Sequence, residues 1–385
     1  MSDVALPGSI EPALSKGPEL DKGFHPLTGI IYLGVVAAAL LFVAYSIYSD
    51  VDATGTKVAS YLPYLMLFIA LLIALGFEFV NGFHDTANAV ATVIYTRSLP
   101  AHIAVVWSGM FNLFGVLLST GAVAFGIVSL LPVELILQVG SSAGFAMVFA
   151  LLIAAILLVI LKTVLLKLTP ALFGEPKNNE APPWWIRGIL ILTCTLVSFF
   201  HGSNDGQKGM GLIVLILIGT VPTAYALNRT MPAGQIEAFI KHSEAASKVI
   251  ETKAGGFQVL GNPRPAVTRY VSEHQIDEGT YPSLAVLVKD VGDQVAKYGS
   301  LNKVPAEVVG NTRNDMYLTS EAIRFLMKDK ENDLSKDEAA TLNTYKKSLD
   351  SATKFIPTWV KVAVAIALGL GTMIGWKRIV ITVGE

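Results

Sequence analysis

Residues 79–90 read FVNGFHDTANAV, and residues 199–210 read FFHGSNDGQKGM. Each stretch places Asn, His, Asp and Gly inside a run of apolar residues, and we call the two stretches the first and second polar motifs. Aligned at an offset of 120 residues, they share three identical pairs: Phe79 and Phe199, Gly82 and Gly202, Asp85 and Asp205. Asn81 and His84 face His201 and Asn204, the same two residue types exchanged. The motifs therefore form an internal repeat.

The composition around the motifs indicates a membrane protein. The chain has 385 residues, of which 52% are hydrophobic and 15% charged, and its mean hydropathy is +0.55. A soluble domain usually carries about 25% charged residues. Several segments approach or exceed the ~18 mostly apolar residues that cross a bilayer. The predicted spans are 27–48, 61–97, 102–131, 142–166, 184–227 and 359–376. We therefore expect an all-α polytopic protein of the cell (inner) membrane.

The chain divides into four parts by composition. Residues 1–27 form a polar tail without the basic start of a cleavable signal peptide. Residues 28–227 form the membrane domain with both polar motifs. In residues 228–357 charges of both signs mix with apolar residues at helical spacing, which predicts a hydrophilic helical insert. Residues 358–385 hold a final transmembrane helix and a short basic tail.

The polar motifs are typical of a transporter site. Paired interrupted helices in the two halves of a transporter mark its binding site. Non-helical backbone survives at membrane depth only where it lines a polar cavity. Gly82 and Gly202 permit the unusual backbone angles of such a break. We therefore expect both motif-bearing helices to be interrupted there.

Asp85 and Asp205 are the clearest functional candidates. A carboxylate inside a membrane segment costs about 2.5–3.5 kcal/mol, so it is a functional hypothesis by default. His84 and His201 fit either a structural hydrogen bond or the site. His201 and Asp205 have the i, i+4 spacing of a ligand pair, but two ligands are too few for a closed metal site. We therefore predict no resident metal.

Two further polar residues fit more than one role. Glu78 precedes the first motif and matches Ser198 in the repeat. It is either a carboxylate that carries a proton or one that faces a neighbouring helix end. Asn112 lies within an apolar span and is either a ligand or a hydrogen-bonding contact between helices. Near-neutral charge makes nucleic acid an unlikely class of partner, whereas a homo-oligomer is compatible with the sequence.

Basic residues favour one topology over another. If each motif lies within one pass, Arg97, Lys162, Arg187 and Lys377 all fall on one side, and only Lys57 falls on the other in a short loop. If each motif is the tip of a hairpin, the basic residues divide between both sides. The positive-inside rule favours the single-pass arrangement. In it the two motif-bearing helices run in opposite directions, and the repeats are inverted.

Three long stretches resemble a known family. They are GFEFVNGFHDTANAVATVIYTRSLP at 76–100, the stretch from PPWWIRG to TAYALN at 182–228, and GLGTMIGWKRIVITVGE at 369–385. They resemble the bacterial inorganic phosphate transporter family of the low-affinity Pit type. The resemblance implies an inverted-repeat secondary transporter, not an enzyme. Its members move phosphate, often as a neutral complex with a divalent metal, coupled to a proton or to sodium.

The resemblance also assigns the site. It implies that the repeated motif binds phosphate and the coupling ion through His84, Asp85, Asn88, Asn204, Asp205 and Lys208. The alignment of the two motifs adds Asn81 and His201 to the predicted phosphate and ion site. Asn side chains donate hydrogen bonds to phosphate oxygens, and Lys208 adds a positive charge. The two Asp residues would hold a proton or a metal cation. No further cofactor is implied.

The chain departs from the family pattern in a second repeated motif, in which Pro and Ser or Thr lead to His. Neither copy is present, which predicts a missing internal block near Ile156 and a missing C-terminal bundle. The alternative to a phosphate symporter is therefore a transport-inactive remnant or a partial chain. A third hypothesis is an intramembrane metal-dependent enzyme built on His84, Asp85, His201 and Asp205.

Overall fold

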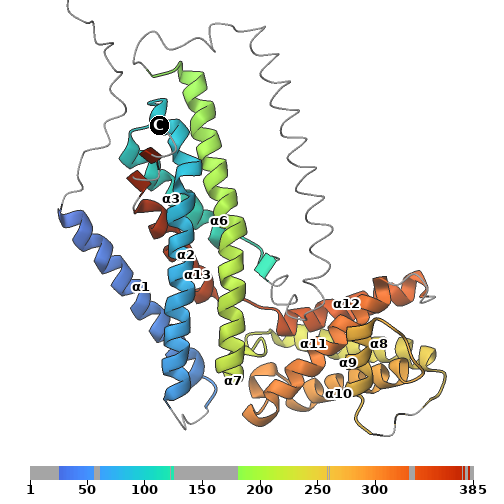
Figure 1. The fold of residues 1–385 in the computed structure, drawn as a ribbon. Coiled ribbons are helices and arrows are strands. Elements are labelled where there is room, and N and C mark those ends of the chain that lie inside the picture. Colours follow the sequence, from blue (N-terminus) through green and yellow to red (C-terminus); the bar gives the residue numbers. More distant parts are fainter. Residues whose placement is uncertain are drawn as a thin grey trace, which may run out of the picture.

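The computed structural model describes residues 26–55, 61–121, 123–124, 181–257, 259, 261–328, 334–374, 376–377 and 380–381. The predicted span 142–166, the end of the predicted span 102–131 and most of the N-terminal tail lie outside these residues. The described part is helical and contains a membrane bundle and a second group of helices at one end of it (Figure 1).

Within the described residues, five helices form the membrane bundle. They are α1 (Pro26–Asp52), α2 (Leu62–Tyr95), α3 (Ala101–Leu118), α6 (Trp184–Thr220) and α13 (Thr358–Met373). Among the described residues, α1, α2, α3 and α6 are each long and apolar enough to cross a membrane. With 16 residues, α13 passes this test only together with α12, which it meets at a bend of 68°. The protein is therefore a helical membrane protein.

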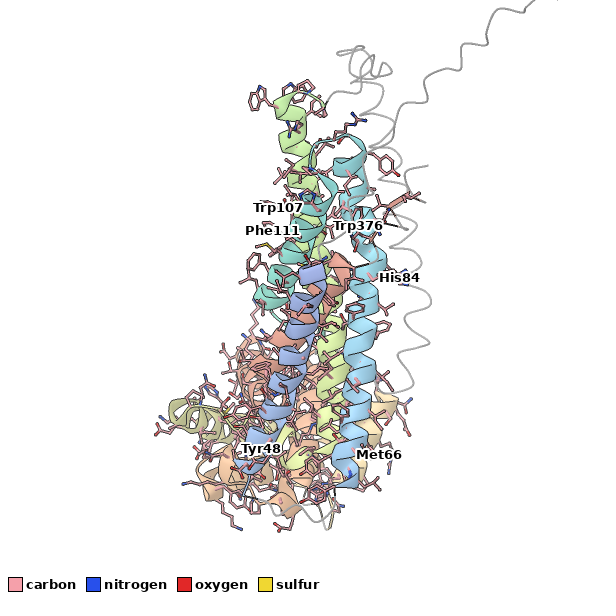
Figure 2. All side chains as sticks on the ribbon, turned by 90° about the vertical axis from the view of Figure 1, so that its left-hand side faces the viewer. Tyr48, Met66, His84, Trp107, Phe111 and Trp376 are labelled. Atoms are coloured by element: carbon pink, nitrogen blue, oxygen red, sulfur yellow. The ribbon has the colours of Figure 1, made fainter. Side chains whose placement is uncertain are left out.

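The outer surface of the bundle is apolar. On α1 the large side chains Leu41 and Tyr48 are exposed, and on α2 Met66 and Ile73 are exposed. Figure 2 labels Tyr48 and Met66. A soluble protein rarely leaves so extended an apolar surface uncovered. This surface is suited to lipid.

The expected interruption of the two motif-bearing helices is wrong. Helix α2 runs through the first polar motif, and α6 runs through the second, each without a break. The hairpin alternative does not fit these continuous helices, which agree with a single pass for each motif. At ~1.5 Å per residue, the 34 residues of α2 exceed the ~30 Å of a hydrocarbon core. The excess length therefore extends beyond the bilayer core without any unwinding.

Gly82 and Gly202 serve close helix packing instead. A Cβ atom on Gly82 would overlap the carbonyl oxygen of Leu368 on α13, and one on Gly202 would overlap that of Asn112 on α3. Small residues at such positions let helix backbones approach closely within a membrane. The sequence alone does not distinguish the two roles of glycine, because a helix break and a close helix contact both favour a residue without a side chain.

The two close contacts repeat the same geometry. Gly371 of α13 lies against Phe79 of α2 in the way that Gly82 lies against Leu368. Gly115 of α3 lies against Phe199 of α6 in the way that Gly202 lies against Asn112. The pair α2 and α13 thus matches the pair α6 and α3, contact by contact. In Figure 1, α2 and α6 lie side by side and run in opposite directions.

The second group of helices follows α7 (Pro222–Tyr225). It contains α8 (Ala233–Ala254), α9 (Arg264–Glu273), α10 (Thr280–Tyr298), the short 3-10 helix η2 (Leu301–Lys303), α11 (Ala306–Lys328) and α12 (Lys336–Thr353). These helices share an apolar core around Phe239, Leu284 and Tyr345. They lie within the predicted boundaries 228–357, and the chain re-enters the membrane bundle through α13 (Figure 1).

Candidate functional site

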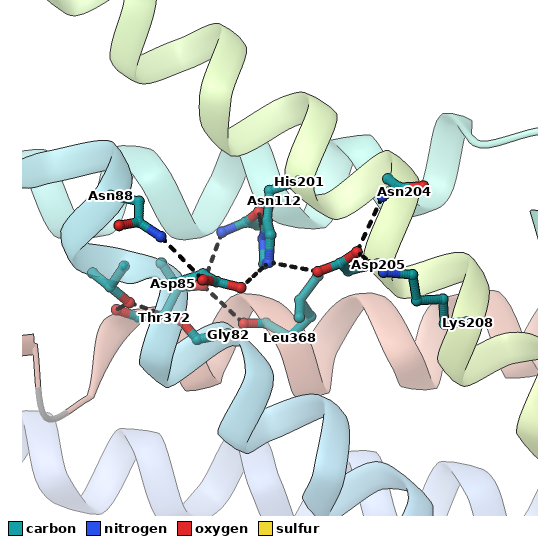
Figure 3. Close-up of polar contacts among 11 residues, drawn as sticks. Gly82, Asp85, Asn88, Asn112, His201, Asn204, Asp205, Lys208, Leu368 and Thr372 are labelled. Atoms are coloured by element: carbon teal, nitrogen blue, oxygen red, sulfur yellow. Dashed lines mark hydrogen bonds and ion pairs between the residues drawn. The ribbon is translucent and has the colours of Figure 1, made fainter. Parts of the chain in front are cut away.

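The two polar motifs meet at one imidazole. His201 of α6 places its Nε2 atom 2.7 Å from Asp85 Oδ2 of α2 and 3.3 Å from Asp205 Oδ2, one turn further along α6 (Figure 3). Asp85 and Asp205, which correspond in the repeat, are therefore joined through His201. Helices α2 and α6 run antiparallel to each other, and these side chains meet where the two helices pack together.

The other ring nitrogen of His201 is held by α3. His201 Nδ1 lies 2.9 Å from Asn112 Oδ1, and Asn112 Nδ2 donates to Thr372 Oγ1 of α13 at 2.9 Å. Thr372 in turn donates to the carbonyl of Leu368 at 2.9 Å. Because Asn112 presents its oxygen to the ring, Nδ1 is the protonated nitrogen that donates. The interface thus orients the imidazole from two further helices.

This orientation has a consequence for charge. With Nδ1 donating to Asn112, His201 Nε2 faces two carboxylate oxygens. Two ionised carboxylates can only accept, so a proton or a metal cation must lie between them and Nε2. The cluster of Asp85, His201 and Asp205 is therefore a site for positive charge.

The same three residues form a candidate cation centre. One ligand atom from each of Asp85, His201 and Asp205 lies within 4.8 Å of the others. The helical spacing of His201 and Asp205 indicated only two ligands, and the fold supplies the third from α2. Three protein ligands leave coordination positions open to another group, as at metal sites that bind substrate. Carboxylate ligands suit Mg²⁺ and Mn²⁺.

The edge of the cluster carries hydrogen-bond donors. Lys208 Nζ donates to Asp205 Oδ1 at 2.6 Å, and Asn204 Nδ2 donates to the same oxygen at 3.2 Å. On α2, Asn88 Nδ2 donates to Asp85 Oδ1 at 3.1 Å. Asn88, Asn204 and Lys208 are exposed, whereas His201 is mostly covered. Each carboxylate therefore has one oxygen turned toward His201 and one toward exposed donors.

A small cavity adjoins the cluster. Its volume is about 100 Å³, and it is lined by Asp85, Asn88, Ala89, Asn112, Val197, Ser198 and His201. A water molecule takes about 30 Å³ of liquid volume, so the cavity has room for only a few water-sized groups. It reaches Asp85 and His201 from the side of α3.

Two predicted site residues lie apart from the cluster. His84 is exposed and points away from the neighbouring helices, and its ring contacts that of Phe83 (Figure 2). Asn81 is half-buried one turn before Asp85 and makes no side-chain hydrogen bond within the described residues. The structure brings together the other six polar residues of the predicted set. Gly82 and Gly202 lie at the helix contacts described above.

Sequence reasoning did not select the threonines. Thr86 shares its hydroxyl hydrogen between the carbonyls of Gly82, at 2.8 Å, and Thr372, at 3.0 Å. Its repeat partner is Gly206, so the alignment of the motifs gave it no weight. Thr372 lies 286 positions from Thr86 in the chain, and no local pattern connects the two. Asn112 was recognised as polar within a span, and the structure shows it linking His201 to α13.

Comparison with known proteins gives a consistent family. A profile of the phosphate transporter family matches residues 81–168 and 172–385. The chain is 32% identical over 406 positions to the low-affinity inorganic phosphate transporter PitA of Escherichia coli strain K12, covering 83% of this chain and 80% of that protein. It is 30% identical over 411 positions to PitB of the same organism, with the same coverage. No solved structure matches the chain.

More distant bacteria have relatives too. The probable low-affinity inorganic phosphate transporter of Bacillus subtilis strain 168 is 26% identical over 250 positions, which cover 51% of this chain and 72% of the relative. The 406 positions aligned with PitA exceed the 385 residues of the chain, so PitA has residues where this chain has none. This agrees with the predicted missing internal block. The matches identify a transporter rather than an enzyme, and the chain belongs to the phosphate transporter family.

Proposed function

We propose that the chain carries inorganic phosphate across the cell (inner) membrane by symport with a cation. The observation that carries the proposal is the meeting of Asp85, His201 and Asp205 inside the helix bundle. Charged groups within membrane helices are expensive and mark ion pathways. The family and the names of its characterised relatives supply the substrate class.

The charges of the cluster explain why a cation accompanies phosphate. Asp85 and Asp205 are negative when ionised, and phosphate is an anion. A buried site cannot hold all three without compensating positive charge. Lys208 supplies one charge, and the remainder comes with the substrate as a proton, a sodium ion or a divalent metal. Binding of the anion then requires binding of the cation, which is the condition for symport.

Donors and acceptors are arranged for such a pair of ions. The amides of Asn88 and Asn204 and the ammonium of Lys208 lie at the exposed edge, where they can donate to phosphate oxygens. The oxygens of Asp85 and Asp205 that face His201 accept the cation. A divalent metal bound there would keep open positions for phosphate oxygens, so a neutral metal–phosphate complex fits the site as cargo.

The repeated helix contacts support an inverted repeat. Helices α2 and α6 are antiparallel, and each packs through its motif glycine against a helix from the other half of the chain. In transporters with inverted repeats, the two halves exchange conformations to open the site to either side. We infer that the pair α2 and α13 and the pair α6 and α3 exchange roles in this way.

The test is uptake of radiolabelled phosphate by liposomes that contain the purified chain. Uptake is compared under an inward proton gradient, under an inward sodium gradient and without any gradient. Each condition is tested with and without Mg²⁺. We expect uptake above that of protein-free liposomes, stimulation by one of the two gradients, and no uptake of sulfate. Stimulation by Mg²⁺ would identify a metal–phosphate cargo.

The same experiment addresses the transport-inactive remnant. Correctly inserted chain that moves no phosphate under any gradient would favour the remnant over the symporter. Binding of phosphate without transport, measured by calorimetry on the purified protein, would indicate that the site is intact and that a partner chain completes the pathway.

A further inference from the structure

Glu78 is a buried carboxyl group that the proposed site does not use. It lies on α2 two turns before Asp85, and its side chain is completely covered, with 0% exposed. Neither carboxyl oxygen has a hydrogen-bond partner among the described residues. The carboxyl group lies against α6, where a Cβ atom on Gly209 would overlap it. Glycine at 209 therefore leaves the space that the carboxyl group fills.

The repeat shows what a structural residue at this position does. Ser198 corresponds to Glu78, and its hydroxyl donates to the carbonyl of Cys194 at 2.8 Å and pairs with Ser108 Oγ at 2.8 Å. Ser198 thus satisfies its hydrogen bonds and joins α6 to α3. Glu78 forms no side-chain hydrogen bond within the described residues. A hydrogen bond between helices therefore does not explain why an acid is placed there.

Two charged groups of α6 lie close enough to act electrostatically on Glu78. They are Asp205 and Lys208, which are paired with each other at 2.6 Å. The other helices around α2 contribute little charge. Within its described residues α3 carries one titratable side chain, the exposed His102, and α13 carries Lys361, which donates to the carbonyl of Ser119 at 3.2 Å. On α2 itself, Asp85 bonds His201 and His84 points outward.

These surroundings determine which form of the acid is stable. An ionised carboxylate that is buried without a donor or a bound cation is strongly disfavoured, and such a group takes up a proton instead. In the arrangement observed, Lys208 is committed to Asp205, so Glu78 is stable as the neutral acid. In the loaded site Lys208 would donate to phosphate, but once phosphate has left, the ammonium could turn from Asp205 to Glu78. Ionisation of Glu78 would then cost much less.

We propose that Glu78 is the group that carries the coupling proton, a role that rests on the proposed phosphate symport. A proton from water on one side of the membrane bonds to a carboxyl oxygen of Glu78, and the neutral acid accompanies the loaded site. On the other side that O–H bond breaks, the proton returns to water, and the carboxylate pairs with Lys208. Each cycle moves one proton and consumes no other reactant.

The experiment separates proton-coupled transport from phosphate movement alone. Glu78→Gln keeps the shape of the neutral acid but cannot release a proton. Liposomes with the full-length variant are assayed for uptake driven by a pH gradient, and for exchange of internal unlabelled with external labelled phosphate at equal pH. We expect driven uptake to fall to the level of protein-free liposomes while exchange persists. Glu78→Asp should restore part of the driven uptake.

Asp50→Asn is the matched control. Asp50 is a carboxylate of the same bundle, but it accepts hydrogen bonds from Tyr225 and Trp359 at 2.9 and 3.0 Å, away from the polar motifs. We expect this variant to keep driven uptake. Infrared spectra of the purified protein add a readout that does not depend on transport. The carbonyl band of a protonated carboxylic acid should be present in the parent protein and lost in Glu78→Gln.

The outcomes are distinct. Driven uptake by Glu78→Gln at the parent rate overturns the proposal, and so does loss of both uptake and exchange, which would assign Glu78 to folding or to phosphate binding. An unchanged infrared band overturns it as well. If the parent protein itself moves no phosphate, the proposed function fails, a result that the parent liposomes show before any variant is compared.

Discussion

His201 Nε2 lies 2.7 Å from Asp85 Oδ2, and this contact joins residues 116 positions apart in the chain. It links the first polar motif to the second, and Asn112 and Thr372 extend the link to α3 and α13. Four membrane helices therefore share one hydrogen-bonded chain. We therefore expect a change in the charge between His201 and the two carboxylates to alter the contacts among these four helices.

Asp85→Asn and Asp205→Asn should each abolish coupled uptake while the chain still inserts in the membrane. Either change removes a negative oxygen next to His201 Nε2 and with it the site for the cation. Hydrogen bonds to charged groups contribute about 1.5–3 kcal/mol, so cation affinity should fall by about tenfold or more. Uptake by liposomes and the cation dependence of uptake measure the effect.

His84→Gln is the control for these variants. His84 belongs to the same motif but is exposed and lies apart from the cluster. We expect it to keep at least half of the parent uptake, about the variation expected of a neutral surface change. Parent-like uptake by Asp85→Asn, or complete loss in His84→Gln, would show that the cluster is assigned to the wrong residues.

Gly82→Ala and Gly202→Ala should destabilise the helix bundle. In each variant the new methyl group would overlap a backbone carbonyl of the neighbouring helix, which cannot move aside as a side chain can. Overpacking of this kind costs about 1–3 kcal/mol or more. The melting temperature of the purified protein in detergent measures the loss.

Gly76→Ala on α2 and Gly219→Ala on α6 are the matched controls, since no described atom lies within 4 Å of a Cβ at either position. Alanine favours a helix over glycine by about 0.5–1 kcal/mol, so these variants should be neutral or slightly more stable. Equal melting temperatures for all four variants would mean that the glycines at 82 and 202 do not hold helices in contact.

The class of fold could be predicted from the sequence because the hydropathy of each segment is a local property. Hydropathy over 27–48 and 184–227 identifies membrane helices without knowledge of their neighbours. The break at Gly82 was wrongly predicted because a glycine required by an approaching backbone looks the same as one required by a turn. Only the position of Leu368 distinguishes the two, and it comes from α13, which is separated from α2 by the insert.

Some residues of the candidate site could likewise be predicted from the sequence, whereas others depend on how the helices pack. The repeat placed Asp85 and Asp205 in equivalent positions, and the structure brings both to His201. The repeat also paired His84 with Asn204, but a helical turn of 3.6 residues carries His84 off the interface that contains Asp85. Thr372 completes the chain of hydrogen bonds from a helix with no polar motif, so nothing near the motifs pointed to it.

Asp350→Asn should destabilise the helices of the insert in a pH-dependent way. Asp350 accepts hydrogen bonds from Ser320 at 2.7 Å, Lys346 at 2.5 Å and Lys354 at 2.9 Å. Burial alone would raise the pKa of Asp350, but the two lysines and Ser320 outweigh it and lower the pKa below the ordinary value of 3.8. The stabilisation is therefore present above about pH 3.8 and is lost as the pH falls through the lowered pKa.

At neutral pH we expect the variant to lose about 1.5–3 kcal/mol in the free energy of unfolding. The difference between variant and parent should shrink in acid, because the parent carboxylate is then protonated. Asp293→Asn serves as the control, since its pair with Lys289 is mostly exposed and such pairs contribute little to stability. A loss for Asp350→Asn that is the same at both pH values would contradict the assignment.

The last prediction concerns the two ends of α6. Because α6 is one continuous helix from Trp184 to Thr220, Trp184 and the helices of the insert must lie on opposite sides of the membrane. The distribution of basic residues predicts that the Trp184 end lies in the cytoplasm and the insert outside. Single cysteines at Trp184 and at Ser272, both exposed, are introduced in a Cys194→Ser background and treated with an impermeant thiol reagent on intact cells. In intact cells we expect labelling of Ser272→Cys alone. Trp184→Cys should be labelled only after the cells are opened.

Two other outcomes would contradict this arrangement. Labelling of Trp184→Cys alone in intact cells would reverse the orientation and keep the single pass. Labelling of both in intact cells would mean that α6 does not cross the bilayer.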